Sequence, residues 1–237
     1  MSKIVHQIWI TKSKPPPLKA IRLWEAIAKK SGWEYKFWDQ NNLKDLKMTN
    51  LKMFENFTDS TDAHSPSDIA RFEVVNKYGG LYVDCDFVPV ANHIEDVLPI
   101  KHDLFIGVTE HNYQPQKFKY SNCLLSNYNS SVHICNGIFY APLENPIIKK
   151  YVNDLNDSLN FQRSNGIEFS GCDSLGCFYL TNIAKQYEFM LLPMYKVFFS
   201  PEEISIGDKQ KYKDKVLCCY VHDHNFDRLK TIFADNF

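Results

Sequence analysis

The sequence lacks any long apolar run, and no window approaches the ~18 consecutive apolar residues of a membrane-spanning helix. Its first residues, MSKIVH, contain no hydrophobic signal region, so we expect at most peripheral contact with a membrane. A formal net charge of -1 over 237 residues gives no bulk attraction to nucleic acid or to anionic lipid. Nucleic acid is therefore not an expected partner.

The seven cysteines also lack the spacing of a metal-binding motif, and their number is odd. Without a secretory signal, these residues are expected to be free thiols in a reducing compartment. We therefore predict a cytoplasmic location.

Internal repeats, low-complexity segments and linkers are absent as well. The length suffices for one sizeable α/β domain with a full core, and 44% hydrophobic and 23% charged residues are ordinary for a globular protein. We therefore predict a single domain over residues 1–237.

Apolar periodicity predicts strands that alternate with helices. Strands are expected at residues 3–10, 33–38, 81–83, 103–109, 134–141, 189–192 and 216–222. Helices are expected at residues 18–30, 67–78, 146–155 and 174–186, with short helices between 39 and 56. This alternation, seen throughout the first half of the chain, favours a mixed α/β sheet.

The most informative segment is SDIARFEVVNKYGGLYVDCDFV, residues 67–88, which predicts a helix, a glycine stop and a short strand. Ser65 or Ser67 is expected to cap the helix. Asp84 and Asp86 are expected to share one face of extended chain, where they repel each other unless a cation binds between them. Such oxygen ligands suit Mg²⁺ or Mn²⁺, and a pair at a strand end suggests a metal that holds a phosphorylated ligand.

Two further charged side chains belong to the same segment. Asp68 and Arg71 are three residues apart in the predicted helix and so lie on one face. A surface salt bridge is the simplest role for this pair. The whole segment nevertheless brings a carboxylate, a guanidinium and the two aspartates close to one another.

The pattern S-D-I-A-R-F followed by Y-G-G-L-Y-V-D-C-D resembles the glycosyltransferases with a DXD sugar-binding region. That group includes fungal initiating α-1,6-mannosyltransferases and α-1,4-galactosyltransferases. The resemblance extends to IVHQIWI near the start, to WEYKFWD and to the segment NGIFYA, at residues 4–10, 33–39 and 136–141.

The resemblance implies a GT-A fold, with a single Rossmann-like mixed sheet flanked by helices. In this fold the D-x-D carboxylates bind Mn²⁺ or Mg²⁺ at the diphosphate of a nucleotide sugar. Asp86 would be the direct ligand, and Asp84 would contact the ribose, or the metal through water. Asp68 and Arg71 would hold the hydroxyls of the donor sugar. His222 falls on a histidine of the family's late segment and would be a third ligand, although His224 replaces the usual tryptophan.

Three more positions have implied roles and simpler alternatives. Trp9 would stack on the base, or it is a core tryptophan of a buried strand. Asn136 would reach the donor sugar, or its role is structural, in a turn or in packing. Asp173 would contact donor or acceptor, or it caps the following helix.

The implied activity is metal-dependent, retaining transfer of a hexose from a nucleotide sugar to a glycan or lipid-linked acceptor. A UDP-sugar is favoured as donor, and GDP-mannose is possible. Residues 1–90 would mainly bind nucleotide sugar and metal, with residues 91–237 on the acceptor side. A bacterial or viral polysaccharide pathway fits a protein without an anchor.

Two other functions compete. Asp84-x-Asp86-x-Val88 also fits the nucleophile motif of haloacid-dehalogenase-type phosphohydrolases, although that motif usually stands near the chain start. A non-catalytic module that binds nucleotide sugar or glycan is the second, and His224 in place of tryptophan favours it.

Overall fold

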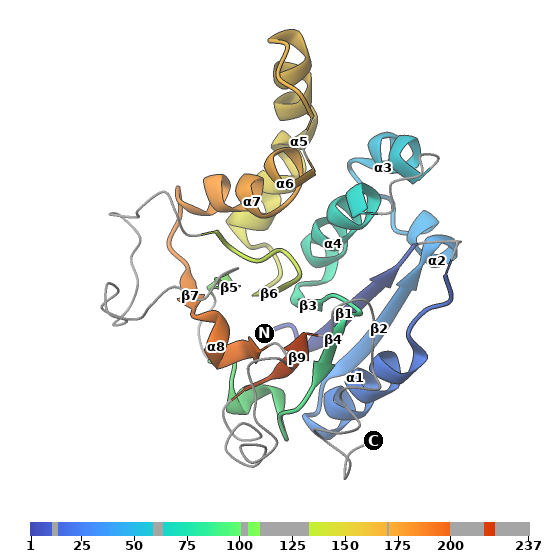
Figure 1. Cartoon of the computed structure of the whole chain (residues 1–237), viewed down its shortest axis with the longest axis vertical. Coiled ribbons are helices and arrows are strands. Elements are labelled where there is room, and N and C mark those ends of the chain that lie inside the picture. The colour runs from blue at the N-terminus through green and yellow to red at the C-terminus, as the bar shows by residue number, and fades with distance from the viewer. Residues whose placement is uncertain are drawn as a thin grey trace.

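The computed structural model describes residues 1–10, 14–58, 64–100, 104–109, 133–169, 171–199 and 216–220 (Figure 1). A six-stranded sheet with the order β2-β1-β3-β6-β5-β7 forms its centre. The strands are β1 (Ile4–Trp9), β2 (Glu34–Asp39), β3 (Gly80–Val83), β5 (Ile106–Val108), β6 (Ile138–Ala141) and β7 (Met190–Leu192). Each of these strands was predicted, although β5 and β6 are shorter than the predicted segments.

The sheet is mixed, as predicted. Strand β1 is parallel to β2 and β3, and β5 is parallel to β7, whereas β6 is antiparallel to β3 and β5. A second sheet has the order β4-β9-β8, with bounds Phe87–Pro89, Cys218–Tyr220 and Phe198–Phe199. Strands β4 and β8 were not predicted, because two or three residues are too few to show an alternating pattern.

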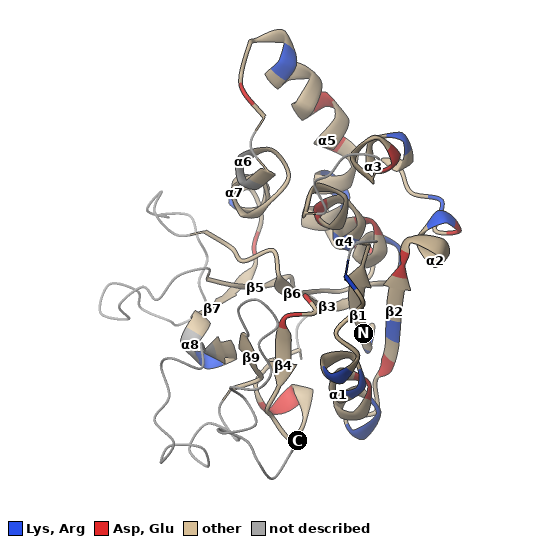
Figure 2. Ribbon diagram, turned by 45° about the vertical axis from the view of Figure 1, so that its right-hand side comes forward, with Lys and Arg blue, Asp and Glu red and all other residues tan. Residues whose placement is uncertain are grey.

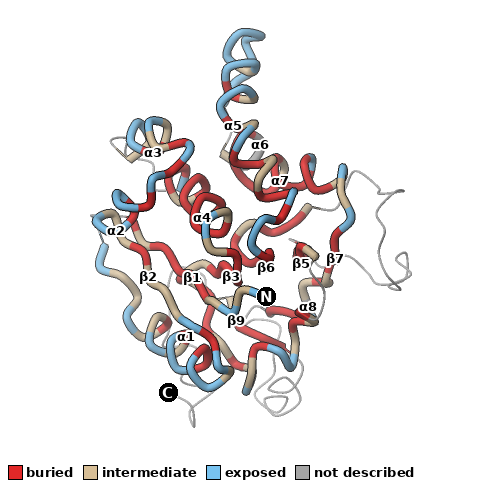
Figure 3. Tube along the Cα trace, turned by 180° about the vertical axis from the view of Figure 1, so that it is seen from behind, coloured by how far each residue is buried: buried red, intermediate tan, exposed pale blue. Residues whose placement is uncertain are grey.

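Helices cover both faces of the central sheet. Those packed against the face of Ile8, Tyr82 and Phe139 are α2 (Gln40–Lys44), α3 (Leu51–Thr58), α4 (His64–Tyr78), α5 (Pro146–Ser164) and α7 (Cys177–Ala184). Helix α1 (Leu18–Lys30) and the second sheet pack against the face of Val5, Leu81 and Ile138. Figure 3 shows that the central strands are buried between these two layers and that much of α4 is buried as well.

Helix α4 differs from the prediction at its start and in its burial. It begins at His64, so Ser65 and Ser67 lie inside its first turn and do not cap it. Ile69, Phe72, Val75 and Tyr78 recur at helical spacing, which predicts an inward stripe; the first three are buried, and Tyr78 is half-buried. The polar side of α4 is enclosed as well between residues 68 and 73. The three charged residues of this stretch are all buried: Asp68, Arg71 and Glu73.

The glycine pair after α4 allows the chain to turn closely against β1. Gly79 and Gly80 have φ angles of 63° and 113°, and a Cβ on Gly80 would stand 2.4 Å from the carbonyl oxygen of Ile4. His6 Nε2 donates to the carbonyl of Gly79 at 2.8 Å, and its Nδ1 accepts from Trp38 Nε1 at 3.2 Å. Burial lowers the pKa of His6 to about 4, so this histidine is a neutral structural link.

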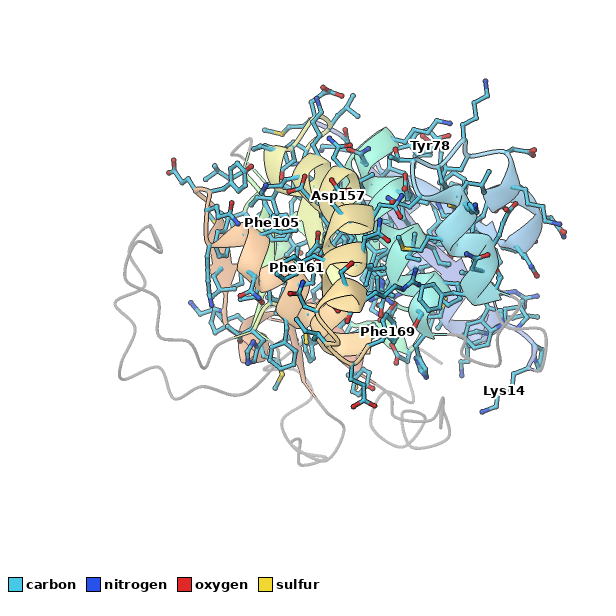
Figure 4. All side chains as sticks on the ribbon, turned by 90° about the horizontal axis from the view of Figure 1, so that it is seen from above. Lys14, Tyr78, Phe105, Asp157, Phe161 and Phe169 are labelled. Carbon is cyan, nitrogen blue, oxygen red and sulfur yellow. The ribbon has the colours of Figure 1, made fainter. Side chains whose placement is uncertain are left out.

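Helix α5 is longer than predicted, and the helix predicted at 174–186 is divided. Asn145 caps α5 by accepting from the backbone N–H groups of Ile147 and Ile148, at 3.1 and 3.4 Å. Its far end extends beyond the body (Figure 1), and Phe161 there, which is labelled in Figure 4, is 64% exposed. The divided helix becomes α6 (Gly171–Ser174) and α7, because Gly176 adopts a non-helical conformation between them.

Charged residues of both signs are interspersed over the outer helices α1 and α5 (Figure 2). Helix α8 (Met194–Val197) and a 3-10 turn at Ile94–Asp96 complete the described elements. Within the described ranges, no helix combines the length and apolarity that crossing a membrane requires.

Candidate functional site

The candidate site lies where β1 and β3 end, at the turn between β3 and β4. Strand β3 stops at Val83, and the backbone N–H of Phe87 donates to the carbonyl of Asp84 at 3.2 Å. Asp84 and Asp86 therefore belong to a turn, and the prediction that they share one face of extended chain is wrong. The turn gives the two carboxylates different surroundings.

Arg71 is the centre of the site. Its Nη2 lies 3.1 Å from Asp68 Oδ1 and 3.4 Å from Asp84 Oδ1. Its Nη1 donates to the carbonyl of Asn136 at 2.7 Å, and its side chain is only 6% exposed. Burial disfavours the charged form of Arg71, but Asp84, Tyr82 and Asp68 outweigh this effect and raise its pKa. The guanidinium therefore stays charged, as a fixed cation inside the site.

Asp84 is held at both carboxylate oxygens. Tyr82 Oη donates to Oδ1 at 2.5 Å, and Arg71 Nη1 donates to Oδ2 at 3.4 Å. The backbone is fixed as well, because Asp84 N–H donates to the carbonyl of Gly137 at 2.8 Å and Gln7 Nε2 donates to the carbonyl of Asp84 at 3.3 Å. Asp84 is thus a rigidly placed carboxylate, with a side chain 29% exposed.

Asn136 joins the same network from the strand next to β3. It precedes β6, and its Nδ2 donates to Asp68 Oδ1 at 2.8 Å. The structure therefore brings together Asp68, Arg71, Asp84 and Asn136, four of the residues selected from the sequence. The simpler alternative for Asp68 and Arg71, an exposed salt bridge, is wrong because both residues are buried.

Asp86 has a very different environment from Asp84. The residue is half-buried, and its Oδ1 is enclosed with no hydrogen-bond partner among the described residues. Burial and the charge of Asp84 raise the pKa of Asp86 to about 8, although a backbone hydrogen bond and Arg71 act in the opposite direction. An enclosed carboxylate oxygen without a partner is a fitting ligand for a hard divalent cation.

The described residues alone do not complete a metal site. Within these ranges, no group of three or more His, Cys, Asp or Glu side chains could hold an ion. The predicted third ligand, His222, and its neighbour His224 lie outside the described residues. Their coordination therefore stays a prediction.

The remaining predicted residues are placed only in part. Trp9 ends β1 at the same edge of the sheet, is half-buried, and donates from Nε1 to the carbonyl of Lys14 at 3.1 Å. The backbone of Asp173 belongs to α6, while its side chain lies outside the description. Base stacking by Trp9 and a ligand contact by Asp173 stay predictions.

Two residues that orient the site were not selected from the sequence. Tyr82 precedes Asp84 by two positions, and its ring lies 4.9 Å from the guanidinium carbon of Arg71. Strand alternation was a usable signal for Tyr82, because it places residues two apart on one face. Gln7 offered no such signal, since its contact with Asp84 depends on the neighbouring strand.

Part of the chain matches a known family, and two solved structures are similar in fold. Residues 16–104 match the family described as glycosyltransferase sugar-binding region containing DXD motif. The structure of PaToxG glycosyltransferase is similar with a TM-score of 0.52 and 19% identity, over 78% of this chain and 69% of that one. A glycosyltransferase involved in the glycosylation of the major capsid of PBCV-1 is similar with a TM-score of 0.50 and 10% identity, over 99% and 98%.

At such identities, the two structures show a shared fold. The predicted GT-A fold is confirmed, with a mixed Rossmann-like sheet between helices. No curated protein matches the chain in sequence.

Proposed function

We propose that this chain, whose residues 16–104 match the family described as glycosyltransferase sugar-binding region containing DXD motif, transfers a hexose from a nucleotide sugar to a glycan or lipid-linked acceptor. One observation supports the proposal above the others. The buried Arg71 holds Asp68, Asp84 and Asn136 in one network, beside an Asp86 carboxylate whose enclosed oxygen has no partner among the described residues.

The two motif aspartates take different roles in this proposal. Asp86 would be the direct ligand of Mn²⁺ or Mg²⁺, with His222 as a further ligand. When bound, the cation supplies Lewis-acid stabilisation of the negative charge that develops on the leaving diphosphate. Asp84 orients the site and contacts the ribose or a metal-bound water, since both of its oxygens already accept hydrogen bonds.

The donor sugar would lie against Asp68, Arg71 and Asn136, which are fixed by their mutual contacts. A fixed set of hydrogen-bonding groups orients a substrate at little cost in entropy. Trp9 would stack on the base at the end of β1, and Asp173 would contact donor or acceptor. We favour a UDP-sugar as donor, which is the donor that the family resemblance favours, and we propose a cytoplasmic location from the expectation that the cysteines are free thiols.

We propose that the transfer retains the anomeric configuration by same-face attack. In this scheme the acceptor hydroxyl gives its proton to the departing phosphate, and no protein nucleophile is required. Asp84 suits an orienting role better than a nucleophilic one, because Arg71 and Tyr82 hold both of its oxygens. The same contacts argue against the phosphohydrolase alternative, which needs Asp84 as an attacking group.

The test is nucleotide release from a panel of UDP- and GDP-sugars with Mn²⁺, with and without simple sugar acceptors. Asp86→Asn should abolish release, whereas Asp45→Asn, an exposed aspartate after α2, should leave it unchanged. Release of phosphate from simple esters without turnover of any nucleotide sugar would support a phosphohydrolase instead. Binding of a nucleotide sugar without turnover would support a non-catalytic binding module.

A further inference from the structure

Gly137, the residue immediately before β6, lies against the carboxylate of Asp84. We propose that Gly137 is a positioning residue whose missing side chain leaves the space in which Asp84 is held. Its expected effect on catalysis rests on the proposed function, whereas its effect on packing does not.

The close approach follows from the pairing of β3 with β6. Val83 pairs with Ile138, and one step further the backbone N–H of Asp84 donates to the carbonyl of Gly137 at 2.8 Å. A Cβ on Gly137 would stand 2.7 Å from Asp84 Oδ2 and 3.3 Å from Cε2 of Phe87. Real Cβ atoms essentially never approach another heavy atom within 3.0 Å, so an alanine at this position requires a neighbour to move.

Neither neighbour moves easily. The carboxylate of Asp84 has a short side chain, and shifting it lengthens its contacts with Arg71, both of 3.4 Å, and with Tyr82. Phe87, on the other side, packs against the rings of Phe198 and Tyr220 at 4.9 and 5.1 Å between centroids. The carboxylate is therefore the group that a Cβ would displace, and its displacement breaks the link to Arg71.

Glycine is required here for space and not for backbone conformation. The glycines with positive φ in the described residues are Gly32, Gly79, Gly80 and Gly166. Gly137 has an ordinary φ, so alanine fits the backbone and the substitution tests the contact alone.

The first experiment measures thermal stability in a double-mutant cycle of Gly137→Ala and Asp84→Ala. Gly137→Ala should lower Tm by about 3–8 °C in the native background, the range expected for overpacking in a chain of this size. In the Asp84→Ala background the clash is absent, and the loss should fall to less than about a third of that value. Gly171→Ala is the control, because a Cβ on Gly171 meets no atom within 4 Å.

Equal losses of Tm in both backgrounds would overturn the proposal. If Gly137→Ala alone fails to fold, the double variant should fold, and its failure would count against the proposal just as clearly. This cycle does not depend on any enzymatic activity.

The second experiment measures nucleotide release by the same variants. Gly137→Ala should lower kcat/KM about 10–100-fold at a temperature where it is fully folded, as expected for a displaced orienting group. Asp84→Ala and the double variant should have equal activity, because both lack the positioned carboxylate. Native-like turnover by Gly137→Ala would overturn its role, whereas no turnover by the native protein would contradict only the proposed function.

Discussion

Asp86→Asn should stabilise the metal-free protein at neutral pH, although it removes a proposed catalytic group. The pKa of Asp86 is raised from the ordinary 3.8 to about 8 by burial and by Asp84. Between these two values the folded state holds a proton that the unfolded chain has released. The stability contributed by Asp86 is therefore complete below pH 3.8 and is lost as pH rises to about 8.

The free energy of unfolding lost at pH 7 follows from the difference between pH 7 and the ordinary pKa of Asp86, 3.8. About three pKa units at ~1.36 kcal/mol each give an upper limit of about 4 kcal/mol. Because Asp86 is half-buried and keeps part of its hydration, we expect about 1–3 kcal/mol. For a chain of this length, that corresponds to a rise in Tm of about 3–8 °C for Asp86→Asn.

The measurement is thermal unfolding in EDTA at a series of pH values from 4 to 9. The Tm difference between Asp86→Asn and the native protein should be small at pH 4, grow through neutrality and level off above pH 8, whereas Asp45→Asn should show no such trend. Addition of Mn²⁺ and UDP should raise the Tm of the native protein only. A difference that does not vary with pH refutes the burial argument, and an equal response of Asp86→Asn to Mn²⁺ refutes its role as a ligand.

Three further predictions concern the groups that support the site. Arg71→Lys should lower turnover at least ~100-fold, because one ammonium cannot contact two carboxylates and a carbonyl together; nucleotide release measures it. His6 has a pKa lowered to about 4 by burial, so its contribution of up to ~3 kcal/mol is complete above pH 6.5 and is lost as pH falls to about 4. Urea unfolding at these pH values in the Asp86→Asn background should show this loss, and His6→Gln should remove it. Gly80→Ala should destabilise the fold by at least ~2 kcal/mol in the same assay, whereas Gly32→Ala, with positive φ but open space, should lose only about 1 kcal/mol. Equal losses for the two glycines would contradict the close approach to β1.

Long periodic segments of the fold were predictable from the sequence, and short ones were not. Helix α1 has the predicted bounds, since thirteen residues with regular apolar spacing and a following glycine define it locally. Strand β4 has three residues and exists because it pairs with β9, about 130 positions later in the chain. Local patterns carry no information about such a partner.

The candidate site shows the same division. Helical spacing was enough to place Asp68 and Arg71 together, because neighbours three residues apart share a face in any helix. The conformation of Asp84 and Asp86 was predicted wrongly, since the turn that ends β3 replaced the expected strand. The space at Gly137 was not visible, because it depends on which residue of β3 lies opposite β6.

The turn between β3 and β4 explains why Asp84 and Asp86, which are two residues apart, have such different electrostatic surroundings. Arg71 compensates Asp84 within the protein, so that carboxylate is fixed with or without a ligand. Asp86 receives only a minor effect from the same guanidinium, and its enclosed oxygen has no partner among the described residues. The fold therefore stabilises the geometry of the site with Asp84 and, in the absence of a cation, leaves Asp86 protonated at neutral pH. A cation bound there takes the place of that proton and removes the cost of enclosing the ionised Asp86 carboxylate without a partner.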